Sequence, residues 1–374
     1  MHILLLPSWY ATKQAPMNGS FFREQAIALA KHSEHRVSLL AVVSDAEGAA
    51  YTEEYDDQGV HTIVCHFRAI RGLGLWQTRR HALRLFRRYF ANDLPSLLHV
   101  HSFSACDYAR RISRRYGIPY VVTEHSTIFA RHLMTARNRR IAAKGFGGAA
   151  RVLAVSDGLK RRIEPYCKEP VTVVPNMVAD SFFDPPLAAE PSDAAFRFVS
   201  IGYLQKKKGM DCLLDALALL HREHPVRLVI CGGGEEQTAL QRQAERLGIA
   251  DQVDFLGTLP REEVREQLMK SHAFVLASRF ETFGIVFTEA LACGKPVIMT
   301  DTDAAKTIVH EGNGYVVPVD DAAALSEAME RMIAEYDRFE PSALREDCRR
   351  RFSEQAICRR LIEIYGEILA DPSL

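Results

Sequence analysis

Short apolar runs, many rich in β-branched residues, alternate along the first half of the chain with longer stretches of helical periodicity. The short runs predict buried strands, and the longer stretches predict amphipathic helices. A strand followed by a helix, repeated several times, is typical of a parallel sheet with helices on both faces. The predicted strands are 2–6, 36–43, 61–67, 97–101, 120–123, 151–155 and 171–174, and the predicted helices are 21–31, 76–90, 105–116 and 158–166.

The alternation stops between Val178 and Ala195, where three prolines interrupt it, and it restarts at Phe196. We therefore predict a linker between residues 178 and 195. The second half predicts strands at 196–201, 227–231, 253–256, 273–276, 296–300 and 315–317, and helices at 209–222, 235–247, 262–270, 285–292 and from 322 onward. The expected fold is α/β, with two Rossmann-like domains at 1–178 and 195–350 and a final helix near 353–370 that packs back on the first domain.

Length and composition agree with two globular domains, because 374 residues exceed one ordinary core and 47% of them are hydrophobic. The eight cysteines form no C-x-x-C pair, which argues against a zinc site or a disulfide framework. The first residues lack the basic leader and long apolar core of a signal peptide, and no later run is long enough to span a membrane. We expect a cytoplasmic protein.

The net charge of zero hides an asymmetry between the two halves. Residues 1–178 carry 25 Lys and Arg against 14 Asp and Glu. This excess predicts that the first half meets an anionic surface, either phospholipid or a phosphate-bearing substrate. The stretch from Arg68 to Phe90 combines seven arginines with apolar residues and has two interpretations: a surface that rests on anionic lipid, or an ordinary helix packed on the sheet. Nucleic acid is disfavoured, because no recognition module accompanies the charge.

The segment from Ser278 to Ile298 follows a predicted strand and opens a helix. Ligands of open parallel sheets bind beyond the carboxyl ends of strands, where the amides of a helix N-terminus attract phosphate. Glu281 precedes the helix and Glu289 lies about two turns into it, so their carboxylates are separated by roughly 10 Å along the axis. Two carboxylates that accept hydrogen bonds from hydroxyls, with amides near Gly284 between them, suit an elongated ligand of sugar, diphosphate and ribose.

This segment resembles the retaining glycosyltransferases of family 4, which have the GT-B fold. The resemblance rests on Glu281 and Glu289 with seven residues between them, among them Phe283-Gly284, and on Gly294 to Val297 after them. Further matching pieces run in the family's order: 7–10, 18–19, 21–26, 155–156, 174–176, 199–202, 208–209, 228–234, 255–257 and 312–314. The opening pieces are similar to a branch common among bacterial surface-polysaccharide enzymes, and the resemblance covers nearly the whole chain.

The resemblance implies two domains whose parallel sheets face each other across a cleft, and transfer of a sugar from a nucleoside diphosphate sugar to a hydroxyl of a saccharide or lipid-linked saccharide. The configuration at the anomeric carbon would be retained. Catalytic roles fall on His125, Lys208 and Glu281. Donor-binding roles fall on Gly19, Lys208, Gly232, Gly234, Glu281, Phe283, Gly284, Ile285 and Glu289. Structural alternatives stay open for Gly19, as a turn or cap glycine, and for His125, as a buried structural histidine.

The chain departs from the family at Tyr203, where an arginine is usual. Either Lys206 or Lys207 supplies the second positive charge, or one lysine suffices, or the donor binds differently. We expect no cofactor and no metal, because basic residues and helix amides cover the diphosphate in this fold; the acidic pair at Asp301 and Asp303 is set aside. A UDP-sugar is the favoured donor.

Two rival functions remain open at this stage. One is a nonhydrolysing sugar-nucleotide epimerase, which shares the architecture. The other is a noncatalytic sugar-nucleotide sensor, motivated by Tyr203. A nicotinamide-dependent dehydrogenase is disfavoured, because the three glycines 232–234 are followed by Glu235 and Glu236 and lack the spacing of a dinucleotide fingerprint.

Overall fold

The computed structural model describes residues 1–12, 15, 18–187, 195–220 and 224–371. These residues form two compact units. Unit 1 consists of Met1–Val155, Leu159–Asn176 and Glu354–Leu374, and unit 2 of Ser156–Gly158 and Met177–Ser353. Part of the predicted linker, 188–194, lies outside the described residues, as does the end of the predicted helix 209–222.

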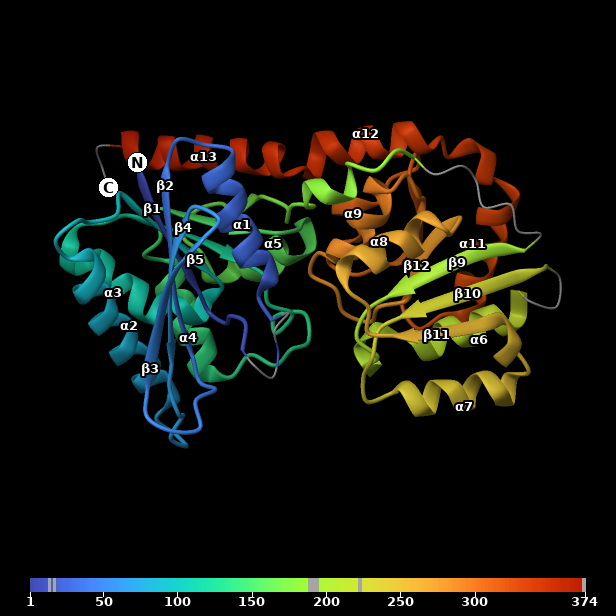
Figure 1. Cartoon of the computed structure of the whole chain (residues 1–374), viewed down its shortest axis with the longest axis horizontal. Helices are drawn as coiled ribbons and strands as arrows, with labels where there is room; N and C mark the ends of the chain where they lie inside the picture. Colours follow the sequence, from blue (N-terminus) through green and yellow to red (C-terminus); the bar gives the residue numbers. More distant parts are fainter. Residues whose placement is uncertain (13–14, 16–17, 188–194, 221–223, 372–374) are drawn as a thin grey trace. The chain divides into compact units, whose positions relative to one another are not determined.

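Unit 1 is built on an eight-stranded sheet in the order β3-β4-β2-β1-β5-β6-β7-β8 (Figure 1). Its strands are β1 (His2–Pro7), β2 (Arg36–Val43), β3 (Tyr51–Asp57), β4 (Val60–His66), β5 (Leu97–His101), β6 (Tyr120–Glu124), β7 (Arg151–Ala154) and β8 (Thr172–Val173). All neighbours are parallel except β3 and β4. The sequence pattern missed β3, because an edge strand with mostly exposed side chains lacks the apolar run of a buried strand.

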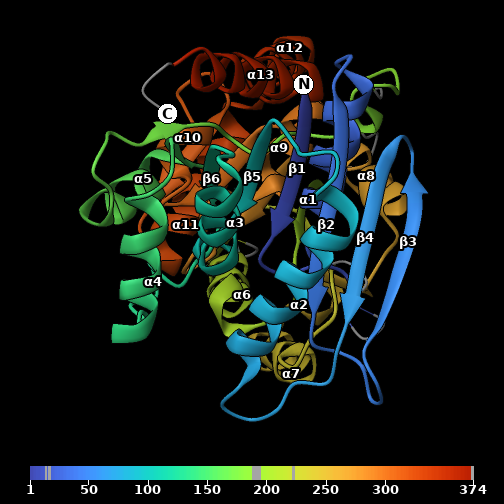
Figure 2. The ribbon, with the colours of Figure 1, turned by 90° about the vertical axis from the view of Figure 1, so that its left-hand side faces the viewer.

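Helices cover both faces of this sheet. Helices α1 (Ser20–Lys31) and α13 (Glu354–Ala370) pack together on one face, so the last helix belongs to unit 1. Helices α2 (Gly74–Phe90), α3 (Cys106–Tyr116) and α4 (Ala136–Phe146) lie side by side on the other face (Figure 2). Right-handed crossovers explain this division, since the chain reverses its direction across the sheet between β4 and β5. Helix α5 (Asp157–Ile163) follows β7.

Helix α4 is a second element that the sequence pattern missed. Only Ala142, Gly145 and Phe146 of its eleven residues are buried, so its apolar stripe is too narrow to stand out. Thr135 caps its start, where the side chain accepts a hydrogen bond from the Asn138 amide at 3.1 Å.

Unit 2 contains a six-stranded, fully parallel sheet in the order β11-β10-β9-β12-β13-β14. Its strands are β9 (Phe196–Ile201), β10 (Val226–Cys231), β11 (Val253–Gly257), β12 (Ala273–Leu276), β13 (Val297–Thr300) and β14 (Gly314–Val317). Its helices are α6 (Met210–Leu220), α7 (Gln237–Leu247), α8 (Arg261–Met269), α9 (Ile285–Ala292), α10 (Ala305–Ile308), α11 (Ala322–Ala334) and α12 (Pro341–Phe352). The prediction of two Rossmann-like α/β domains is confirmed.

Each sheet has one point where the strand order reverses. It lies between β1 and β5 in unit 1 and between β9 and β12 in unit 2. The connections from neighbouring strands diverge there, and the space between them is the usual ligand site of an open α/β sheet. Among the described residues, no helix has the length and apolar character needed to span a membrane.

Three buried histidines lie at the carboxyl end of the unit 1 sheet. His99 and His101 are two residues apart in β5, and His125 directly follows β6. The Tyr365 hydroxyl on α13 lies 2.7 Å from His99 Nδ1, and His101 Nδ1 lies 3.1 Å from His125 Nε2. Burial lowers the pKa of His99 and of His125 to about 3, and it holds the pKa of His101 well below its usual value. All three imidazoles are therefore neutral at pH 7.

These histidines predict a pH-dependent stability of unit 1. In the unfolded chain they take up protons below about pH 6.5, whereas the folded imidazoles stay neutral to about pH 3. Stability should fall as the pH falls below 6.5, by about 2 kcal/mol per histidine between pH 6.5 and pH 5. Urea unfolding followed by tryptophan fluorescence measures this, because both tryptophans, Trp9 and Trp76, belong to unit 1.

The control for this experiment compares two substitutions. His99→Gln should remove one histidine's share of the pH slope. His132→Asn should leave the slope unchanged, since His132 is exposed and asparagine tolerates its positive φ of 54°. An unchanged slope in His99→Gln would contradict the assignment.

Candidate active site

The switch point of the unit 2 sheet brings a lysine against a glutamate. Lys208 lies in the turn between β9 and α6, and Glu281 lies in the loop between β12 and α9. Lys208 Nζ donates a hydrogen bond to Glu281 Oε2 at 2.6 Å. Both side chains are largely buried, with exposed fractions of 16% and 11%. The two residues that the sequence predicted to hold the diphosphate and the sugar are therefore direct partners.

A glycine contact determines where Lys208 lies. Gly209, directly after it, has a φ of 63°, and a Cβ built there would lie 1.9 Å from the Ala277 carbonyl oxygen. The turn therefore packs directly against the residue that follows β12, which only glycine allows. The Lys208 stem also lies over Gly202, at 3.6 Å from a Cβ built there. These two contacts hold the ammonium beside the loop that carries Glu281.

The second glutamate of the motif has a partner that the sequence analysis missed. Glu289 on α9 is buried, and its Oε1 accepts a hydrogen bond from Arg261 at 2.7 Å. Arg261 is the first residue of α8, and its guanidinium also stacks over the Phe182 ring at 5.1 Å. The sequence did place Arg261 directly before a predicted helix, next to Pro260 and shortly after a predicted strand, and that position was the available sign of a site residue.

The residues between the two glutamates turn the chain into α9. Gly284 caps the helix with a φ of 78°, and a Cβ built there would lie 2.8 Å from Phe287 and 2.9 Å from Glu281 Cγ. The Phe283 side chain is buried against Phe352, so only its backbone remains for a ligand. Ile285 begins α9. The amides that follow Gly284 stand at the N-terminus of a helix, where a negative charge is favoured.

The glycines of the 232–234 loop are explained by packing. A Cβ on Gly232 would lie 2.0 Å from the Gly202 carbonyl oxygen, and a Cβ on Gly234 would lie 2.5 Å from the Leu204 oxygen. The loop after β10 thus lies directly against the loop after β9. Donor binding by Gly232 and Gly234 stays a prediction, and the close backbone contact already requires glycine at both positions.

Tyr203, which stands where the family usually has an arginine, is exposed. The Tyr203 side chain has an exposed fraction of 58%. Lys206 is exposed and Lys207 is half-buried. Arg279 braces this turn by donating to the Lys206 carbonyl at 2.5 Å and to both carboxylate oxygens of Asp211 at 2.9 Å. Which lysine, if either, replaces the arginine stays open.

In unit 1, His125 lies at the end of β6 in a shell of buried partners. The Glu124 carboxylate ties its loop to the loop after β5, because it accepts hydrogen bonds from Ser102 Oγ at 2.6 Å and from the Phe103, His125 and Ser126 amides. Burial raises the pKa of Glu124, and these hydrogen bonds oppose the rise. Phe21 packs against His125 with ring centroids 5.0 Å apart.

Gly19 caps α1 with a φ of 73°, and a Cβ built there would lie 3.1 Å from the Trp9 carbonyl oxygen. The positive φ and this close contact with the chain's own backbone favour glycine at this position. Packing therefore explains glycine at position 19 without a ligand, and the proposed donor contact stays a prediction.

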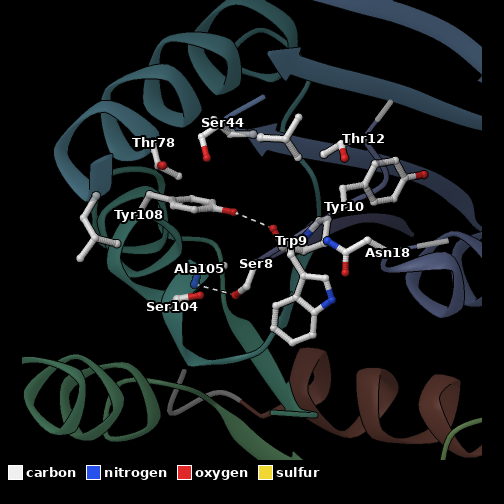
Figure 3. Close-up of a pocket in the computed structure, with 14 residues that line it drawn as sticks. Ser8, Trp9, Tyr10, Thr12, Asn18, Ser44, Thr78, Ser104, Ala105 and Tyr108 are labelled. Atoms are coloured by element: carbon white, nitrogen blue, oxygen red, sulfur yellow. Dashed lines mark hydrogen bonds between the residues drawn. The ribbon is translucent and has the colours of Figure 1, made fainter. Parts of the chain in front are cut away.

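A pocket of about 230 Å³ lies at the switch point of the unit 1 sheet (Figure 3). Its walls come from the loops after β1, β2 and β5 and from the start of α2. Ser8 holds two of these loops together, because its hydroxyl donates to the Ser102 carbonyl and accepts from the Ala105 amide. Among the described residues, the lining has hydroxyls and three aromatic side chains but no charged side chain: Pro7, Ser8, Trp9, Tyr10, Thr12, Asn18, Val42, Val43, Ser44, Leu75, Thr78, Ser104, Ala105 and Tyr108.

Two family models match the chain in succession. Residues 19–182 match "Glycosyltransferase Family 4", and residues 189–356 match "Glycosyl transferases group 1". The chain is 24% identical over 293 residues to a phosphatidylinositol N-acetylglucosaminyltransferase subunit of Arabidopsis thaliana, a match that covers 77% of this chain and 65% of that protein. It is 26% identical over 302 residues to phosphatidyl-myo-inositol mannosyltransferase of Mycobacterium leprae, which covers 77% of each. Against several curated relatives, the chain spans less than two thirds of their length.

Solved structures share the fold over the full chain. Sucrose-phosphate synthase of Thermosynechococcus elongatus superposes with a TM-score of 0.79 at 19% identity, covering 99% of this chain and 100% of that one. HepE of Anabaena, solved with UDP and glucose, superposes with a TM-score of 0.75 at 20% identity, covering 98% and 100%. Both family models and the two Rossmann-like units lead to one conclusion: the chain belongs to glycosyltransferase family 4 and has the GT-B fold.

Proposed function

We propose that this protein transfers a sugar from a nucleoside diphosphate sugar to an acceptor hydroxyl, with retention of configuration at the anomeric carbon. The observation that carries the proposal is the contact of Lys208 with Glu281 at the switch point of the unit 2 sheet. Retention follows from the family resemblance. The donor is a UDP-sugar, in keeping with the UDP bound to HepE of Anabaena.

Donor binding exchanges the partners of this ion pair. A diphosphate carries more negative charge than a carboxylate, so it competes for the Lys208 ammonium. Glu281, released from the lysine, accepts hydrogen bonds from hydroxyls of the sugar. Lys208 then stabilises the negative charge that grows on the leaving diphosphate, which requires a cation already in place before the reaction.

The other end of the donor meets Glu289. Its buried carboxylate accepts hydrogen bonds from the ribose hydroxyls, and the hydrogen bond from Arg261 orients it. The amides after Gly284 face the charged middle of the donor. His125, which is neutral, offers a hydrogen bond to the sugar without adding a charge. The leaving diphosphate accepts the proton of the acceptor hydroxyl, so the enzyme supplies no nucleophile.

The acceptor occupies the switch-point pocket of unit 1. Hydroxyl side chains around an opening that also contains the half-buried Trp9 suit a saccharide, whose hydroxyls need partners and whose ring faces are apolar. Two relatives act on phosphatidylinositol, as their names state. A saccharide carried on a lipid is therefore the acceptor class that we propose.

The lipid would be reached at the start of α2. The helix buries Ala82, Leu85, Phe86 and Phe90 in unit 1, so most of its apolar face serves the core. The exposed apolar residues that remain lie at one end: Ile70, Leu73 and Trp76, with exposed fractions of 57%, 46% and 45%. Arginines surround them, and Arg80 lies over the Trp76 ring at 5.3 Å. We propose that this end of α2 rests on an anionic membrane.

Two substitutions at the ion pair should affect different quantities, one the transfer rate and the other the affinity for UDP. Glu281→Ala should lower the transfer rate at least about 100-fold and change the dissociation constant of UDP by less than about threefold. Lys208→Gln should weaken UDP binding roughly tenfold or more, because a charge-assisted hydrogen bond to phosphate is lost. Calorimetry and initial rates measure both effects.

The control for the ion pair is Lys270→Gln, an exposed lysine of unit 2 at the end of α8, which should change neither quantity. A melting panel with UDP, GDP and ADP identifies the base, since a ligand at 100 times its dissociation constant adds about 2.7 kcal/mol to stability. Products formed without an acceptor would indicate the epimerase, and donor binding without turnover on any acceptor would indicate the sensor. Equal loss of transfer and UDP affinity in Glu281→Ala would contradict its role.

The acceptor pocket predicts a substitution that separates the two substrates. Thr78→Val removes a pocket hydroxyl at nearly constant volume, so it should raise the KM for the acceptor about 5- to 20-fold and leave UDP affinity unchanged. Ser113→Ala, on α3 and outside the pocket, is the matched control. An acceptor KM that is unchanged in Thr78→Val would remove the pocket from the reaction.

The membrane contact predicts a loss of binding to anionic vesicles. Ile70→Ser combined with Leu73→Ser should weaken sedimentation with phosphatidylglycerol vesicles roughly tenfold, because two apolar side chains no longer enter the interface. Leu94→Ser with Leu133→Ser removes two equally exposed apolar residues of unit 1 elsewhere and should have no effect. Equal losses in both double variants would argue against this docking site.

A further inference from the structure

We propose that a pocket between α3 and α4 of unit 1 binds a phosphate group. The pocket encloses about 170 Å³, and four cationic side chains line it, two from each helix: Arg110 and Arg111 from α3, Arg140 and Lys144 from α4. It shares no lining residue with the pocket at the switch point. The inference does not depend on the proposed transfer reaction.

The pocket has a fixed floor. A Cβ built on Gly145 of α4 would lie 2.5 Å from Cys106 Cβ and 2.9 Å from its Sγ, so the two helices touch at two residues that line the pocket. Only glycine permits this approach. The Tyr120 hydroxyl donates to the Gly145 carbonyl at 2.5 Å, which fastens α4 to the buried strand β6. The cations on the two helices therefore face a shared space whose walls are held in place.

The charge in this space is not balanced by the protein. Within the part of the chain that the structure describes, none of the four cations forms an ion pair. Asp107 is the acid of the lining, and Arg79 from α2 already lies 3.5 Å from it. Residues 101–150 carry nine Lys and Arg against Asp107 and Glu124, and Glu124 is buried at the end of β6. Like charges gathered around one pocket repel one another, and a bound anion relieves the repulsion.

The residue types select phosphate among anions. Each guanidinium presents parallel N–H donors that match two oxygens of a phosphate, and Lys144 adds a compact charge. The volume equals that of about five or six water molecules, which leaves room for a phosphate group and a part of its hydration shell. The phosphate can come from a lipid headgroup or from a soluble phosphorylated compound, and the experiment distinguishes these sources.

The test compares two double variants with the same change in charge. Arg110→Gln with Arg140→Gln removes one pocket cation from each helix. Arg114→Gln with Arg137→Gln removes one exposed arginine from each of the same helices outside the pocket. Unfolding is followed by tryptophan fluorescence, which reports on unit 1, in inorganic phosphate and in sodium chloride of equal ionic strength.

In the wild-type chain, phosphate at ten times its dissociation constant should raise the unfolding temperature by about 3–6 °C above chloride. The pocket variant should lose this shift and the control variant should keep it. The Lys208→Gln variant should keep it too, which separates this pocket from the proposed donor site. Equal shifts in the pocket and control variants, or none in the wild type, would overturn the proposal.

A second arm identifies the source of the phosphate. Vesicles of phosphatidylcholine with phosphatidic acid, and soluble glycerol 3-phosphate, are each titrated against the chain. Binding to both that is lost only in the pocket variant supports a site that accepts the lipid headgroup. Loss confined to glycerol 3-phosphate supports a soluble ligand. A third outcome is that vesicle binding weakens equally in both double variants and that neither the wild type nor the variants bind glycerol 3-phosphate. This outcome would make the pocket part of a diffuse basic surface and would overturn the proposal.

Discussion

The candidate active site depends on one largely buried contact, the ion pair of Lys208 with Glu281. A charge taken out of water is costly unless an opposite charge compensates it, so each of these residues makes the other tolerable at its position. The pair also suits the donor that we propose. Both groups are already largely desolvated and held in place, and a ligand that offers one phosphate and one hydroxylated ring can satisfy them separately.

Close backbone contacts make that pair possible. Gly209 lets the turn with Lys208 abut Ala277, and Gly232 lets the loop after β10 abut Gly202. Three loops from neighbouring strands are thereby compressed against one another at the switch point of the sheet. Any Cβ at these glycines would push the loops apart and separate the lysine from the glutamate. The glycines thus influence where the Lys208 and Glu281 side chains lie.

Unit 1 differs from unit 2 in where its charged side chains lie. The pocket at its switch point has no charged side chain among the described residues, and the buried side chains nearby include three neutral histidines and a carboxylate that accepts four hydrogen bonds. Thirteen Lys and Arg residues of unit 1 belong instead to α2, α3 and α4, which lie side by side on one face of the sheet (Figure 2). The separation of an uncharged pocket from a basic outer face suits a substrate with a neutral sugar and an anionic carrier.

The sequence by itself determined the α/β class, the two Rossmann-like domains and the segments with Lys208, Glu281 and Glu289, because strand periodicity and a spaced motif are local properties. The exposed edge strand β3 and the narrow-striped helix α4 escaped it, since neither has a strong apolar pattern. Only the tertiary structure paired Arg261 with Glu289 and Lys208 with Glu281, and it added a packing reason for glycine at positions 19 and 232. Those relations join residues far apart in the chain, and their geometry is decided by how the loops of neighbouring strands pack together.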